Sequence, residues 1–186
     1  MSSPTPLDAM RWTPDTDQPR FPALLIPADP TATVHLVDLG DNAHAGARKV
    51  IGCDLIEKVT VEQAGLISLD FLLDEEGSPE CLSDAVFNRR ATILGYALRL
   101  AQMTGEYPAP PDVDKRDLAM AAAVWKRHVR LYGPIVILGA DERTGDWVPV
   151  PERLVEFAAE ALAPERAVRE VRSVSGRGRR FRVGFR

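Results

Sequence analysis

The residues with the clearest chemical potential are carboxylates in and around two expected turns. Asp70, Asp74 and Glu75 lie within and just after an apolar stretch, and Asp141 begins a second turn. Magnesium takes oxygen ligands of this kind, so one hypothesis is a metal-dependent hydrolase or nuclease. That hypothesis requires the four side chains to converge in one cleft. The simpler interpretation is that they are solvated turn residues, because acidic residues are common turn formers.

The carboxyl end of the chain is basic and contains aromatic residues. Residues 166–186 carry a net charge of +7, and subtracting this from the net charge of −4 leaves −11 for residues 1–165. Arginine neutralises phosphates and aromatic rings stack on bases, which suggests nucleic-acid binding. The alternative is that the basic tail folds back on the acidic body, or joins a neighbouring copy as an edge strand. The candidate nucleic-acid contacts are Arg177, Arg179, Arg180, Phe181, Arg182 and Arg186.

Cysteine, histidine and glycine patterns indicate no cofactor. Cys53 and Cys81 are too far apart, and too isolated from histidine, for a structural zinc site. The segment 40–46 contains two glycines but lacks the lysine and Ser/Thr of a phosphate loop, and no helix is expected after it. The sequence around the three histidines does not suggest a catalytic triad with a carboxylate and a nucleophile: His35, His44 and His128.

Length and composition indicate one soluble, cytoplasmic domain. The chain has 186 residues, of which 45% are hydrophobic and 27% charged, as in ordinary globular proteins. No run of about 18 apolar residues is present, as a membrane span would need, and the amino terminus lacks a secretion pattern. We expect a proline-rich arm (residues 1–22), an α+β domain (residues 23–164) and the arginine-rich tail (residues 165–186).

Hydrophobic periodicity predicts strands and helices in a mixed order. An α+β fold follows, in which a small mixed or antiparallel sheet is covered on one face by two or three helices. Asp70 is expected to face outward from its strand. The helices are expected over residues 83–103, 112–132 and 152–162. The strands are expected over residues 23–26, 33–39, 55–61, 67–73, 135–138 and 147–150, with a further strand or a loop over residues 179–185.

Residues 50–151 resemble a family of small domains of unknown function that occurs mainly in phages, plasmids and other mobile elements of bacteria. The resemblance rests on a strand at residues 50–57 (VIGCDLIE), an acidic turn at 73–77 (LDEEG), residues 88–92 (NRRAT) and residues 133–139 (GPIVILG). It implies no catalytic residue.

These patterns favour a non-catalytic accessory or regulatory protein of a mobile genetic element that binds another macromolecule, either protein or nucleic acid. Assembly into a homo-oligomer is compatible with this layout, and no membrane partner is expected. Nucleic-acid binding through the tail and metal-dependent hydrolysis remain the two alternatives.

Overall fold

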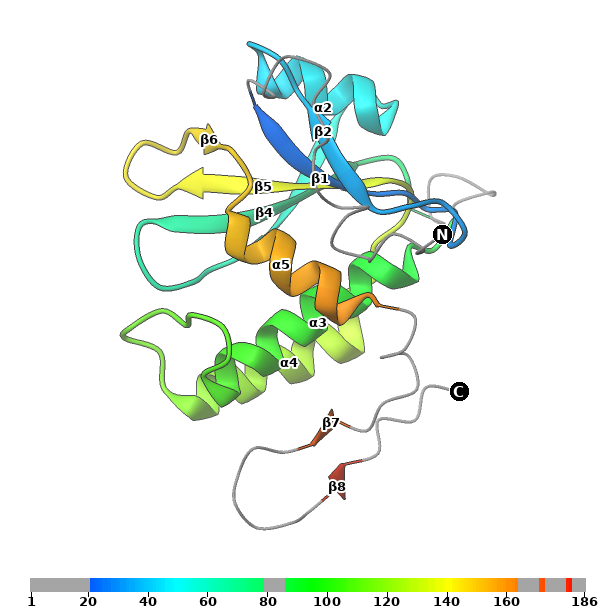
Figure 1. Cartoon of the computed structure of the whole chain (residues 1–186). Coiled ribbons are helices and arrows are strands. Elements are labelled where there is room, and N and C mark those ends of the chain that lie inside the picture. The colour runs from blue at the N-terminus through cyan, green and yellow to red at the C-terminus, as the bar shows by residue number, and fades with distance from the viewer. Residues whose placement is uncertain (1–20, 79–85, 164–170, 173–179, 182–186) are drawn as a thin grey trace, which may run out of the picture.

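A six-stranded antiparallel sheet lies between helices on both of its faces (Figure 1). The computed structural model describes residues 21–78, 86–163, 171–172 and 180–181. The strands of the sheet are β1 (Pro22–Ile26), β2 (His35–Asp38), β3 (Ile56–Val61), β4 (Ile67–Asp74), β5 (Ile135–Asp141) and β6 (Trp147–Val148). The helices are α2 (Ala43–Ile51), α3 (Arg89–Thr104), α4 (Lys115–His128) and α5 (Glu152–Ala161).

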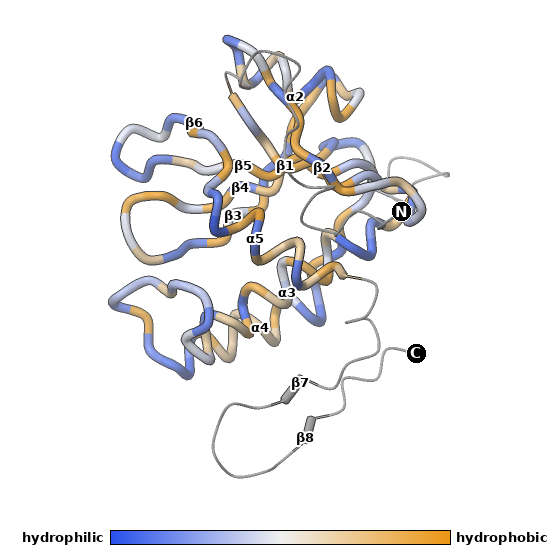
Figure 2. The backbone as a smooth tube through the Cα atoms, in the orientation of Figure 1, coloured by the Kyte–Doolittle hydropathy of each residue, from blue (hydrophilic) through white to orange (hydrophobic). Residues whose placement is uncertain are grey.

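The sheet is antiparallel throughout, with the order β2-β1-β5-β4-β3. Strand β6 pairs with the later half of β5, beyond the residues that pair with β1. The two longest strands, β4 and β5, are adjacent, and β5 is buried from Ile135 to Ala140. In Figure 2 the apolar colouring follows these central strands, while hydrophilic residues predominate in the turns. The predicted α+β class is therefore confirmed, and of the two predicted sheet types, mixed or antiparallel, the sheet is antiparallel.

The larger part of the core lies between the sheet and α3, α4 and α5. Strand residues such as Leu69, Phe71 and Ile137 point to this face, because side chains alternate along a strand. They meet Leu94 and Leu98 of α3, and the same core includes residues of α4 and α5: Trp125, Leu154 and Ala158. This is the helix-covered face that the sequence predicted. Within the described residues, no helix has the length and apolar character needed to cross a bilayer.

Helix α2 covers the opposite face, where the sequence analysis expected a glycine-containing loop. The Asn42 side chain accepts a hydrogen bond from the Ala45 amide at 3.0 Å and caps the helix. Gly52 ends it with a φ of +82°, a conformation that glycine adopts readily. The expectation of no helix here was wrong, and so was the strand from residue 50, because Val50 and Ile51 form the last turn of α2. The helix buries Ala47 and Ile51 against a second cluster of strand residues, including Ala23, Leu72, Val136 and Leu138.

Helix α3 begins at Arg89, later than the expected start near residue 83. Asn88 is the cap: its side-chain oxygen accepts from the Ala91 amide, and its side-chain nitrogen donates to the carbonyls of Ile26 and Gly133. These bonds join the start of α3 to the end of β1 and to the residues just before β5. Val86 and Phe87 therefore precede the helix rather than lining its apolar face, and Phe87 bridges to Tyr132.

The other elements match the sequence prediction to within a few residues at their ends. Asp114 caps α4 by accepting from the Arg116 and Asp117 amides, and Pro151 precedes α5. Strands β7 (Val171–Arg172) and β8 (Arg180–Phe181) form a separate two-stranded sheet, so the described part of the tail does not join the central sheet. The arm (residues 1–20) and most of the tail lie outside the described residues.

We predict that Gly95→Ala destabilises the protein. Alanine normally stabilises a helix interior by about 1 kcal/mol relative to glycine. A β-carbon at position 95 would overlap ring atoms of Trp125, so α3 and α4 must move apart. We expect a net loss of about 1–3 kcal/mol in the free energy of unfolding, measured by urea denaturation. An unchanged or raised stability for Gly95→Ala would contradict the close packing of position 95 against Trp125.

We predict that Tyr107→Phe removes a loss of stability above pH 10. Burial raises the pKa of Tyr107 to about 12. The unfolded chain loses this proton near pH 10, whereas the folded chain keeps it up to about pH 12. The free energy of unfolding is therefore unaffected by this group below pH 10 and falls by about 2–3 kcal/mol as the pH rises to 12. The hydroxyl has no hydrogen-bond partner among the described residues. The phenylalanine variant should therefore be equally stable at pH 8 and more stable than the parent at pH 11.5, with Tyr132→Phe as the control.

Candidate functional site

Asp70 is fully buried in the middle of β4, on the face that carries α2. The Thr60 hydroxyl donates to one carboxylate oxygen at 2.6 Å. The Lys58 ammonium and the Trp147 indole donate to the other at 3.2 and 3.1 Å. The expectation that Asp70 faces solvent was wrong: this position would be apolar in a plain buried strand, and the three donors make a carboxylate tolerable there.

The Asp70 network connects four elements. Its donors lie on β3 and β6, and the His44 ring of α2 stacks on Trp147 with ring centroids 5.6 Å apart and an interplanar angle of 9°. The Lys58 side chain is 56% exposed, so its charge stays hydrated while the carboxylate is sealed from water. Both Asp70 oxygens already accept hydrogen bonds, so this carboxylate positions its neighbours and has no contact with solvent.

The four predicted metal ligands do not meet in one cleft. Asp70 lies in mid-strand, Asp74 ends β4, and Asp141 pairs with Ile67 at the other end of that strand. At about 3.3 Å per residue, Asp74 and Asp141 are on the order of 23 Å apart. Among the described residues, no group of three or more His, Cys, Asp or Glu side chains could hold a metal ion. The convergence that a metal-dependent hydrolase requires is absent from these residues.

Asp141 serves its own turn. The Arg143 amide donates to its carboxylate at 2.9 Å, and the Arg143 guanidinium lies 3.4 Å from the second oxygen. These hydrogen bonds, the backbone one first, lower the pKa of Asp141 below its ordinary value. The residue is thus an ionised turn former, as the simpler interpretation of the sequence held.

Asp74 and Glu75 line a pocket of about 330 Å³ at the end of β4. The carboxyl end of α4 brings two basic residues, His128 and Arg130, to the same pocket. The sequence analysis identified the acids but missed these neighbours, which are more than 50 residues away along the chain. Acidic and basic groups here line a hollow that a polar or charged group can enter. The remaining lining residues are Glu57, Leu73, Ser78 and Tyr132.

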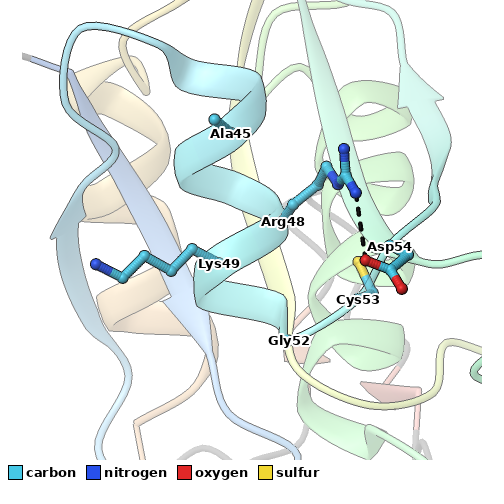
Figure 3. Close-up of a pocket in the computed structure, with 6 residues that line it drawn as sticks. All are labelled: Ala45, Arg48, Lys49, Gly52, Cys53 and Asp54. Atoms are coloured by element: carbon cyan, nitrogen blue, oxygen red, sulfur yellow. Dashed lines mark hydrogen bonds and ion pairs between the residues drawn. The ribbon is translucent and has the colours of Figure 1, made fainter.

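A second hollow, of about 380 Å³, lies at the carboxyl end of α2 (Figure 3). Arg48 points toward Asp54, with 3.3 Å between guanidinium nitrogen and carboxylate oxygen, whereas Lys49 points to the opposite side of the helix. Burial, followed by the nearby charge of Asp74, raises the pKa of the Cys53 thiol. The thiol is therefore protonated and weakly nucleophilic at neutral pH. These side chains do not converge on a common point.

Most of the predicted nucleic-acid contacts lie in parts of the tail that the structure does not describe. Arg177, Arg179, Arg182 and Arg186 lie outside the described residues. Arg180 and Phe181 form β8, whose backbone pairs with β7. Nucleic-acid binding by the tail therefore stays a prediction.

The outward side of α4 is an apolar surface with basic ends. Met120 is 55% exposed and Val124, one turn later, is 49% exposed. Exposed alanines lie beside them, and pairs of basic residues lie in the first and last turns. We call this surface the α4 outer face: Lys115, Arg116, Ala119, Met120, Ala123, Val124, Lys126 and Arg127.

Sequence reasoning missed the α4 outer face because it assigned the charges of this helix to its dipole and its ends. The signal was present in the spacing. Leu118, Ala122 and Trp125 form the buried stripe, and Met120 and Val124 lie away from it on the helical wheel. Large apolar residues that lie away from the buried stripe of a helix indicate a second surface on that helix.

Comparisons with known proteins leave the chain without an assigned relative. No protein-family model, no curated protein and no solved structure matches it. The resemblance to domains of mobile elements therefore stays a prediction, and no functional residue can be transferred from a relative.

We predict that Asp70→Asn lowers the free energy of unfolding by about 1–3 kcal/mol. The amide replaces one charged acceptor oxygen with an NH₂ group, so the Thr60 hydroxyl must turn to accept from it, and the bonds from Lys58 and Trp147 lose their charged acceptor. Urea denaturation followed by far-ultraviolet circular dichroism gives the difference. Asp146→Asn, at an exposed turn position, should change stability by less than about 0.5 kcal/mol. Equal stabilities for the Asp70 variant and its parent would show that the network contributes nothing.

Proposed function

We propose that this protein is a non-catalytic binding protein that holds a partner protein on the α4 outer face. The observation that carries the proposal is the exposure of Met120 and Val124 on successive turns of one helix. Large apolar side chains that lie together on an exposed helix face favour a protein contact, because burying them releases water. Fully burying such a side chain contributes about 1.5–3 kcal/mol, so covering the exposed halves contributes roughly 1 kcal/mol each.

The α4 outer face is held in place from behind. Trp125 donates from its indole nitrogen to the Thr92 carbonyl of α3 at 2.9 Å. Its ring meets Phe71 of the sheet edge to face, at 5.6 Å between centroids. Leu118 and Ala122 are buried on the same side of α4. A partner therefore meets a preformed surface and loses little binding free energy to ordering it.

The arrangement of the other polar groups supports binding over catalysis. Both oxygens of the buried Asp70 carboxylate are occupied by structural donors. Asp141 is engaged by its own turn, and the Cys53 thiol is held in its less reactive form. A surface for a macromolecule, by contrast, requires only exposed and rigidly positioned side chains, which α4 provides.

We predict that Met120→Ser with Val124→Ser weakens partner binding at least tenfold. The partner is first isolated from source cells with the full chain and purified, and its Kd is then measured by isothermal titration calorimetry. Tenfold corresponds to about 1.4 kcal/mol, which two half-buried apolar groups can supply. Because both positions are exposed, the variant should keep its thermal midpoint.

The matched control is Leu55→Ser with Leu66→Ser, which removes two apolar side chains of similar exposure (52% and 47%) that directly precede β3 and β4. This control should change Kd by less than a factor of two. If the control weakens binding and the α4 variant does not, the binding surface lies elsewhere and the proposal is wrong.

A further inference from the structure

The α4 outer face is electropositive, although residues 1–165 as a whole carry −11. Lys115 and Arg116 occupy its first turn, and Lys126 and Arg127 its last. All four are exposed, and Asp117 is the one acidic residue of the helix. Among the described residues, none of these four bases forms an ion pair, and the Lys126 ammonium lies 5.9 Å from the centre of the Tyr96 ring. Their charge is available to a partner.

The basic residues bracket the apolar centre along the helix axis. Arg116 and Arg127 are 11 residues apart, about three helical turns and roughly 16 Å, and both lie on the same side as Met120. Ala119 and Ala123 between them are small, so another helix can approach closely. The surface has the length and periodicity of a short helix, with cations at both ends of an apolar stripe.

A second copy of the chain is a poor match for this surface. An antiparallel two-fold pairing of α4 with itself, centred between Met120 and Ala123, places Arg116 opposite the Arg127 of the second copy. A parallel pairing places each arginine opposite its own equivalent. Either arrangement brings like charges together, which opposes association. The tail of the chain has the same sign as these bases and is disfavoured for the same reason.

Nucleic acid matches the bases but not the centre of the surface. Phosphate contacts would use the four cations and leave Met120 and Val124 exposed to water. A protein segment with apolar and acidic side chains satisfies both parts at once.

We infer that the partner presents an acidic amphipathic helix to the α4 outer face. This inference rests on the proposed function and specifies its partner. The partner helix packs apolar residues at i and i+4 against Met120 and Val124, as in helix-in-groove recognition. Its carboxylates, spaced about three turns apart, lie against Arg116 and Arg127, where they contribute mainly to specificity and to the rate of association.

The test measures fluorescence anisotropy of labelled probes with the full chain at low salt. The first probe is a 21-residue peptide of leucine, alanine and glutamate with leucine at helical spacing. The second replaces every glutamate of that peptide with lysine, the third is a scrambled acidic peptide without an apolar face, and the fourth is a 20-base-pair DNA duplex. We expect the acidic amphipathic peptide to bind at least tenfold more tightly than each of the other three.

Charge reversal separates recognition from adventitious attraction. Arg116→Glu with Arg127→Glu should weaken binding of the acidic peptide at least tenfold and make the lysine peptide the tighter ligand. Lys49→Glu with Arg153→Glu reverses two exposed charges on α2 and α5 and should leave the preference unchanged. Circular dichroism spectra confirm that each variant is folded.

The remaining outcomes decide between this inference and the proposed function. Tighter binding of DNA that depends on Arg116 and Arg127 overturns the acidic helix. A concentration-dependent dimer that Met120→Ser with Val124→Ser abolishes also overturns it, in favour of a second copy. Equal binding of all peptides, together with α4-dependent binding of the purified natural partner, rejects the acidic helix and retains the binding surface. If neither peptides nor natural partner depend on α4, both proposals fail.

Discussion

The packing of Trp125 between α3 and the sheet is the contact on which the rest of the helical layer depends. Its ring occupies the space that any side chain at position 95 would need, and its indole nitrogen donates to the Thr92 carbonyl. At the same time it meets Phe71 at the centre of the sheet. This single side chain sets the distance between α3 and α4 and the rotation of α4 about its own axis. The rotation in turn determines that Met120 and Val124 face outward.

The two faces of the sheet are stabilised in different ways. The face toward α3, α4 and α5 is apolar and carries the larger core. The face toward α2 has a smaller apolar cluster and, next to it, the Asp70 network with Lys58, Thr60 and Trp147. A buried carboxylate that accepts from three donors favours one arrangement of the strands more than it raises the free energy of unfolding. Any shift of β3, β4 or β6 would leave a donor or an acceptor unpaired. The network therefore keeps β3, β4 and β6 aligned on the face of the sheet that carries α2.

Charge is distributed unevenly, and the proposed surface follows from that distribution. Residues 1–165 carry −11, yet the exposed side of α4 is basic. Bases in the last turn favourably interact with the helix dipole, which accounts for Lys126 and Arg127 without reference to a partner. The dipole does not account for Lys115 and Arg116, which lie in the first turn where cations are unfavourable. Basic residues kept at an unfavourable helix end, beside exposed apolar ones, are better explained by a partner of opposite charge.

By itself the sequence determined the α+β class and nearly all strands and helices, because hydrophobic alternation and helical periodicity are local properties, whereas it left the sheet as either mixed or antiparallel. It did not determine α2, a nine-residue helix with Gly46 inside it and Gly52 directly after it, whose stability comes from burying Ala47 and Ile51 against distant strands. Nor did it determine that Asp70 is buried, that Asp141 pairs with the end of β4 opposite to Asp74, or that His128 and Asp74 line the same pocket. Those facts depend on strand pairing and helix packing between residues far apart in the chain, which no local pattern records. The outward direction of Met120 and Val124 also depends on tertiary packing, because α4 buries Trp125 and so turns these two residues to the opposite side.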